Sequence, residues 1–100
     1  MMHINSKTLD EISELCKTNK VKSLFGLGSV TRKDFNDNSD IDLITDFIED
    51  DPFKYTDLYF QVKYNLELIL KKKIDLLEER AIRNKYFRRI VEDTKVKIYG

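Results

Sequence analysis

An acidic Asp-x-Asp pair at the start of an apolar segment is the feature that most constrains how this chain can fold. From residue 40 to residue 47 the sequence reads DIDLITDF, so Asp40 and Asp42 alternate with the aliphatic residues Ile41 and Leu43. Successive side chains of a β-strand point to opposite faces, so this alternation predicts a strand with both carboxylates on one face. The apolar face of such a strand is expected to pack against helices.

The rest of the chain divides into segments with helical or strand patterns. Thr8-x-x-Glu11 has the form of a capping box and predicts a helix that starts near Thr8 and ends at Asn19. Asp51 is a good N-cap for a longer helix that ends at the lysines 71–73. Further elements are expected as strands over residues 21–27, 74–77 and 95–99, and as helical segments over residues 79–84 and 86–93.

The order of these segments predicts an α/β (α+β) fold with a small mixed β-sheet packed with helices. The loop between the first two strands is short enough for antiparallel pairing, whereas the helix between the second and third strands permits a parallel pair. A length of 100 residues suits a single domain, which we expect to span residues 1–100.

Composition argues against several classes of protein. No apolar run approaches the ~20 residues of a membrane span, and the N-terminus shows no secretory signal. The single cysteine, Cys16, cannot form an intrachain disulfide, which favours the cytoplasm, and its expected role is that of a small buried hydrophobe. With His3 as the only histidine, a histidine-based metal or triad site is not expected.

The formal net charge is zero, but the basic residues concentrate in the second half of the chain. Such a cluster is usually a solvated helix face, and it could also receive a triphosphate, a nucleic acid or an acidic partner surface. Its members lie near the C-terminus: Arg80, Arg83, Lys85, Arg88, Arg89, Lys95 and Lys97.

Asp40 and Asp42 have the spacing of metal ligands. Their backbone positions would lie roughly 6.5–7 Å apart on a strand, and two ionised carboxylates that repel at this spacing are relieved by a divalent cation. Asp75 is a candidate third ligand, because a lone carboxylate in its apolar segment is costly unless it is partnered or exposed. Oxygen ligands without histidine or thiolate favour Mg²⁺ or Mn²⁺. Three converging carboxylates can hold two ions about 3.5–4 Å apart for an in-line phosphoryl displacement.

A glycine–serine pair upstream has the chemistry of a phosphate-binding turn. Gly28 allows close approach of the backbone, Ser29 offers a hydroxyl and backbone N–H groups, and Arg32 could reach the same phosphates. The alternative interpretation is a plain turn followed by the polar face of an edge strand. Each signal is weak alone, but together with Asp75 they favour a site.

At this point the sequence resembles the DNA polymerase beta-like nucleotidyltransferase superfamily, and its minimal nucleotidyltransferase (MNT) branch in particular. That branch typically reads Gly-Ser-x-Ala-Arg-Gly, then Ser-Asp-Ile-Asp-Leu, Val-Asp-Leu and Ile-Tyr-Gly. Thr31, Lys33 and Lys71 depart from the pattern, but no carboxylate is lost. Four segments carry the resemblance: Gly28-Ser29, Asp40-Ile41-Asp42, Ile74-Asp75-Leu76 and Ile98-Tyr99-Gly100.

The resemblance implies an enzyme and a set of roles. Asp40, Asp42 and Asp75 would be catalytic and bind Mg²⁺, two ions in all, with Mn²⁺ as a substitute. The triphosphate of ATP or another NTP would be held by Gly28, Ser29 and Arg32.

The resemblance also implies a partner. MNT proteins are often encoded beside HEPN-domain RNase toxins, and some transfer AMP from ATP to a toxin tyrosine. We therefore expect a cytoplasmic antitoxin that moves NMP, AMP first of all, to a hydroxyl of such a partner, in a homo- or hetero-oligomer. Neither a membrane nor direct nucleic-acid binding is expected. Two alternatives are a binding antitoxin that docks without catalysis and an enzyme that nucleotidylates a small molecule such as an aminoglycoside.

Overall fold

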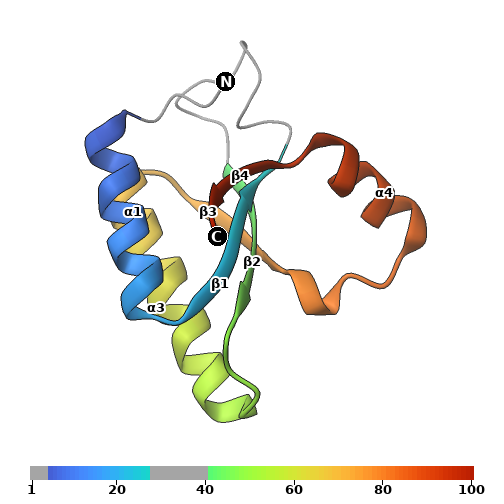
Figure 1. Ribbon diagram of the computed structural model, residues 1–100, viewed down its shortest axis with the longest axis horizontal. Helices are drawn as coiled ribbons and strands as arrows, with labels where there is room; N and C mark the ends of the chain where they lie inside the picture. The colour runs from blue at the N-terminus through green and yellow to red at the C-terminus, as the bar shows by residue number, and fades with distance from the viewer. Residues whose placement is uncertain (1–4, 28–40) are drawn as a thin grey trace.

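The computed structural model describes residues 5–27 and 41–100. Figure 1 shows the helices and strands of this part of the chain around a single sheet. In chain order they are α1 (Ser6–Thr18), β1 (Val21–Gly26), β2 (Ile41–Phe47), α3 (Pro52–Leu70), β3 (Ile74–Glu78), the 3₁₀ helix η1 (Glu79–Ala81), α4 (Lys85–Thr94) and β4 (Val96–Tyr99). The predicted combination of a small sheet with helices is confirmed.

The four described strands form one mixed sheet in the order β3-β2-β1-β4. Strand β1 is antiparallel to β2 and to β4, whereas β2 and β3 are parallel and are connected through α3. Both predicted pairings, antiparallel across the first loop and parallel across the long helix, are confirmed. In this sheet β3 and β4 are the edge strands.

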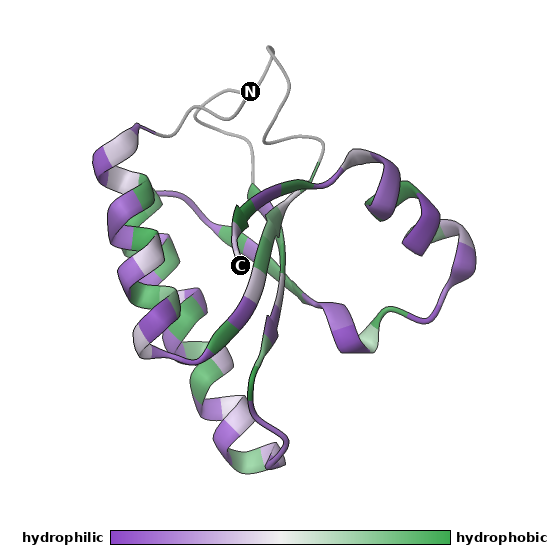
Figure 2. Ribbon diagram, viewed as in Figure 1, coloured by the Kyte–Doolittle hydropathy of each residue, from purple (hydrophilic) through white to green (hydrophobic). Residues whose placement is uncertain are grey.

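Helices α1 and α3 cover one face of the sheet, and α4 lies beyond the opposite side (Figure 1). The hydropathy colours of Figure 2 alternate along α1 and α3, as expected for helices with one apolar side. The main core lies between these helices and the sheet, and the apolar side of α3 contributes to it. Its fully buried members include Ile12, Cys16, Leu24, Leu43, Val62, Leu66 and Ile74.

Cys16 is a buried hydrophobe, as the sequence predicts. None of its surface is exposed, and burial raises the pKa of its thiol to about 12. The thiol is therefore protonated and unreactive in the folded protein at neutral pH.

Helix α1 begins earlier than the sequence pattern suggests. Its N-cap is Asn5, whose side-chain oxygen accepts a hydrogen bond from the backbone N–H of Thr8 at 2.8 Å. The predicted capping box at Thr8 is wrong, because asparagine is at least as good an N-cap as threonine. Asp51 caps α3 as expected, accepting from the N–H groups of Phe53 and Lys54.

Residues 79–84 do not form the predicted helical segment throughout. Only η1 is helical there, and the carbonyls of Glu79 and Ile82 accept hydrogen bonds from the Arg88 guanidinium at 3.2 and 3.1 Å. Asn84 then caps α4 by accepting from two backbone N–H groups, so this helix begins at Lys85.

Lys71 is held in the left-handed conformation, with φ 55° and ψ 38°, where α3 ends. We expect Lys71→Gly to raise the free energy of unfolding by about 0.5–1 kcal/mol, because glycine adopts this conformation without a Cβ penalty. Urea denaturation measures the change. The control Lys73→Gly, at an ordinary φ, should instead lower stability by a similar amount. Equal effects of the two substitutions would contradict the prediction.

Candidate active site

Asp42 and Asp75 lie directly beside each other on neighbouring parallel strands. The register pairs Asp42 of β2 with Asp75 of β3, which places their Cα atoms about 5 Å apart. Ile41 and Leu43 point into the core, so the Asp42 side chain points to the opposite face of the sheet. Asp42 is half-buried and Asp75 is exposed. The predicted adjacency of these two strands is confirmed.

The other predicted site residues, Gly28, Ser29, Arg32 and Asp40, lie outside the described residues. Their assignments as triphosphate and metal ligands therefore stay predictions. The described residues on either side lie at the same end of the sheet: Leu27 donates its N–H to the carbonyl of Asp42 at 3.0 Å, and Ile41 begins β2.

Two side chains of α3 bind the backbone of β3 on either side of Asp75. The Glu67 carboxylate accepts a hydrogen bond from the N–H of Ile74 at 3.1 Å. The Tyr59 hydroxyl donates to the carbonyl of Leu76 at 2.6 Å. Burial, followed by the negative charges of Glu78 and Asp75, raises the pKa of Tyr59, so the phenol remains a proton donor at neutral pH.

Tyr59 belongs to the apolar side of α3, and Glu67 belongs to no motif in the sequence. The ring of Tyr59 packs against the core, and its hydroxyl also donates the hydrogen bond to Leu76. A phenol at one end of an apolar ring is the only sequence signal for that bond. Nothing in the local pattern identifies the partner of Glu67.

The available donor set fits a divalent cation with phosphate oxygens as additional ligands. Within residues 5–27 and 41–100, no group of three or more histidine, cysteine or acidic side chains is arranged to hold a metal. The pair formed by Asp42 and Asp75 supplies carboxylate oxygens, and Mg²⁺ is commonly held by one or two carboxylates together with substrate phosphates. The predicted third ligand, Asp40, precedes β2 outside the described residues.

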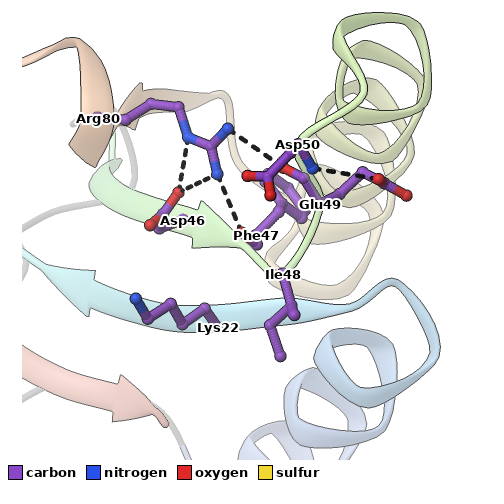
Figure 3. Close-up of a pocket in the computed structure, with 7 residues that line it drawn as sticks. All are labelled: Lys22, Asp46, Phe47, Ile48, Glu49, Asp50 and Arg80. Atoms are coloured by element: carbon purple, nitrogen blue, oxygen red, sulfur yellow. Dashed lines mark hydrogen bonds and ion pairs between the residues drawn. The ribbon is translucent and has the colours of Figure 1, made fainter.

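A separate cleft of about 700 Å³ lies at the other end of β2. Figure 3 shows Arg80 reaching across it to Asp46 and to backbone oxygens. Its Nε and Nη2 lie 3.0 and 2.9 Å from an Asp46 carboxylate oxygen. Its terminal nitrogens also donate to the carbonyls of Phe47 and Glu49. The lining residues are Lys22, Asp46, Phe47, Ile48, Glu49, Asp50 and Arg80.

This cleft is a structural feature rather than the candidate active site. Asp46 is four residues beyond Asp42, which corresponds to about 13 Å along a strand. The guanidinium of Arg80 is bound to protein oxygens and also covers the ring of Tyr55, 4.2 Å from its centroid. Through these hydrogen bonds, Arg80 connects the segment after β3 to the end of β2.

Other members of the basic C-terminal cluster also contact the protein itself. Arg88 pairs with Glu79 at 2.8 Å, and Lys95 pairs with Glu92 at 3.0 Å. The ammonium of Lys95 also lies 4.3 Å from the centroid of the Phe25 ring. The remaining members are exposed, as a solvated face would be: Arg83, Lys85, Arg89 and Lys97.

Comparison with known proteins identifies the class to which this chain belongs. Residues 7–98 match the family described as "Nucleotidyltransferase domain", and the chain belongs to this family. Its members typically use a divalent metal. In the described part of the chain, no helix is both long and apolar enough to cross a membrane.

The chain is also similar to individual proteins and solved structures. It is 33% identical over 95 residues to a protein of Methanocaldococcus jannaschii named "Putative protein adenylyltransferase". The match covers 87% of this chain and 94% of that protein. The solved "Structure of putative minimal nucleotidyltransferase" superposes with a TM-score of 0.73 at 23% identity, over 94% of this chain and 96% of the other.

A further similar structure is a complex. It contains a tri-AMPylated Shewanella oneidensis HEPN toxin with an MNT antitoxin, and the matched chain superposes with a TM-score of 0.62 at 18% identity. The match covers 94% of this chain and 71% of that one. These structural similarities establish the fold, which is that of minimal nucleotidyltransferases, as the sequence resemblance implies.

Proposed function

We propose that this protein transfers a nucleoside monophosphate (NMP) to a hydroxyl group of a partner protein. The preferred reaction is transfer of AMP from ATP. The observation that carries the proposal is the register that sets Asp42 beside Asp75 in a chain of the nucleotidyltransferase family. A protein acceptor is supported by the relative named as a protein adenylyltransferase and by the AMPylated toxin in the similar complex.

In this proposal Asp42 and Asp75, together with Asp40, hold the metal, and Gly28, Ser29 and Arg32 hold the triphosphate. Bound Mg²⁺ would neutralise charge on the phosphates and lower the pKa of the attacking hydroxyl. Asp42 is half-buried, which suits a ligand fixed by the protein, whereas Asp75 is exposed, which leaves it accessible to an acceptor.

The reaction is an in-line displacement at the α-phosphorus of ATP. The acceptor oxygen forms a bond to this phosphorus as the bond to the bridging oxygen breaks, and pyrophosphate leaves. The Asp75 carboxylate is the proposed group that takes the proton of the acceptor hydroxyl and passes it to solvent.

We further propose that the partner is a HEPN-domain toxin and that the protein is its antitoxin. The test is incubation of the protein with Mg²⁺, ATP labelled at the α-phosphate and the product of the neighbouring gene. Label on the partner, located at one hydroxyl by mass spectrometry, supports transfer. Neutralisation of the partner without label would refute it.

A specific feature favours the second candidate, an antitoxin that acts by docking alone. Phe60, Tyr64 and Leu68 recur at four-residue intervals on α3 and are 59, 61 and 56% exposed, so they form an apolar strip of the kind that binds proteins. Under this alternative, neutralisation of the partner persists when ATP is omitted. Under transfer, it requires ATP.

A further inference from the structure

We propose that Glu67 and Tyr59 are positioning residues for Asp75, a role that rests on the proposed function. Strand β3 is an edge strand of the described sheet, with β2 on its inner side only. Its outer backbone groups therefore have no strand partner in that sheet. Glu67 and Tyr59 bind two of these groups, and the two belong to the residues immediately before and after Asp75.

Along a parallel strand, the backbone N–H and C=O groups of successive residues point alternately to the two sides. This alternation explains why these two hydrogen bonds affect Asp75. Ile74 and Leu76 point their N–H and C=O groups away from β2, where the carboxylate and the phenol meet them. Asp75, between them, turns its own backbone towards β2, in register with Asp42. Binding both neighbours from outside holds this register and with it the separation of the two carboxylates.

Helix α3 is a firm support for the two side chains. Val62 and Leu66, on its inner side, have no exposed surface. Glu67 follows Leu66 directly, and Tyr59 lies two turns earlier on the same helix. The buried side of the helix therefore fixes the positions of the two side chains that bind β3. Hydrogen bonds from surrounding groups orient metal ligands in proteins in the same way.

The experiment compares Tyr59→Phe and Glu67→Leu with the parent protein. Tyr86→Phe removes the hydroxyl of a tyrosine of α4 that is 83% exposed and serves as the control, and Glu67→Gln retains an acceptor oxygen and should rescue. The Mn²⁺ dissociation constant, measured in the presence of ATP from the electron paramagnetic resonance of free Mn²⁺, should rise about tenfold for the first two variants. It should stay near the parent value for the other two.

Two further readouts separate positioning from stability. In a transfer assay, kcat should fall for Tyr59→Phe and Glu67→Leu while KM for ATP changes little. Amide exchange at Ile74 should become faster in Glu67→Leu than in Glu67→Gln. A lower melting temperature with unchanged Mn²⁺ affinity and kcat would overturn the positioning role. Parent protein that binds no Mn²⁺ and transfers no label would instead refute the proposed function, and this inference with it.

Discussion

Asp42→Asn is expected to reduce nucleotidyl transfer by about 10³-fold while the protein remains folded. Asparagine has the shape of aspartate but lacks its charge, so it removes the proposed metal ligand from the strand position paired with Asp75. The half-buried side chain at this position can accommodate an amide without a cavity. Transfer of the α-phosphate label to the partner measures the loss, and circular dichroism checks the fold.

Asp46→Asn is the matched control for this prediction. Asp46 lies on the same strand and the same face as Asp42, four residues further on, and its contact is the Arg80 guanidinium. We expect it to retain transfer within a few-fold and to lose about 1 kcal/mol of stability with that ion pair. Equal loss of transfer in both variants would point to a general effect of acidic residues on β2. Full activity of Asp42→Asn would exclude the proposed metal site.

The sequence is sufficient to predict that β2 and β3 pair, but not their register. Alternation of Asp42 with Ile41 and Leu43 defines the buried face, and the helix between the two strands permits the parallel pair. A two-residue slip would keep every apolar side chain on its face and still separate Asp42 from Asp75. The register follows from how α3 packs and where it ends, at Lys71, which are properties of the folded chain.

Contacts between distant residues account for most of what the sequence does not predict. Arg80 meets Asp46 across 34 positions, and the Tyr59 hydroxyl meets the Leu76 carbonyl across 17. Side-chain patterns report which face of an element is buried, but they do not report which polar tip reaches which backbone group. The wrong prediction for the N-cap of α1 has a local cause. Asn5 and Thr8, three positions apart, are both suitable N-cap residues, and Asn5 takes this position.

The largest stability effect is expected for Phe47→Ala, at the end of β2. Phe47 is 2% exposed and packs edge-on against Tyr55 of α3, with ring centroids 5.2 Å apart. Its truncation removes a buried ring and leaves a cavity between the sheet and the helix, which typically costs about 3–5 kcal/mol. A domain of this size loses about 4–8 °C in melting temperature per kcal/mol, so a fall of about 12–40 °C is expected by calorimetry.

Phe53→Ala provides the contrast, because Phe53 also belongs to this region but is 85% exposed. Its truncation should change the melting temperature by no more than about 3 °C. A large fall for both variants would mean that the exposed ring is covered in solution, for example by a second copy of the chain. A small fall for Phe47→Ala would mean that α3 does not pack on β2 as described. That result would also remove the support on which the positions of Tyr59, Glu67 and Asp75 depend.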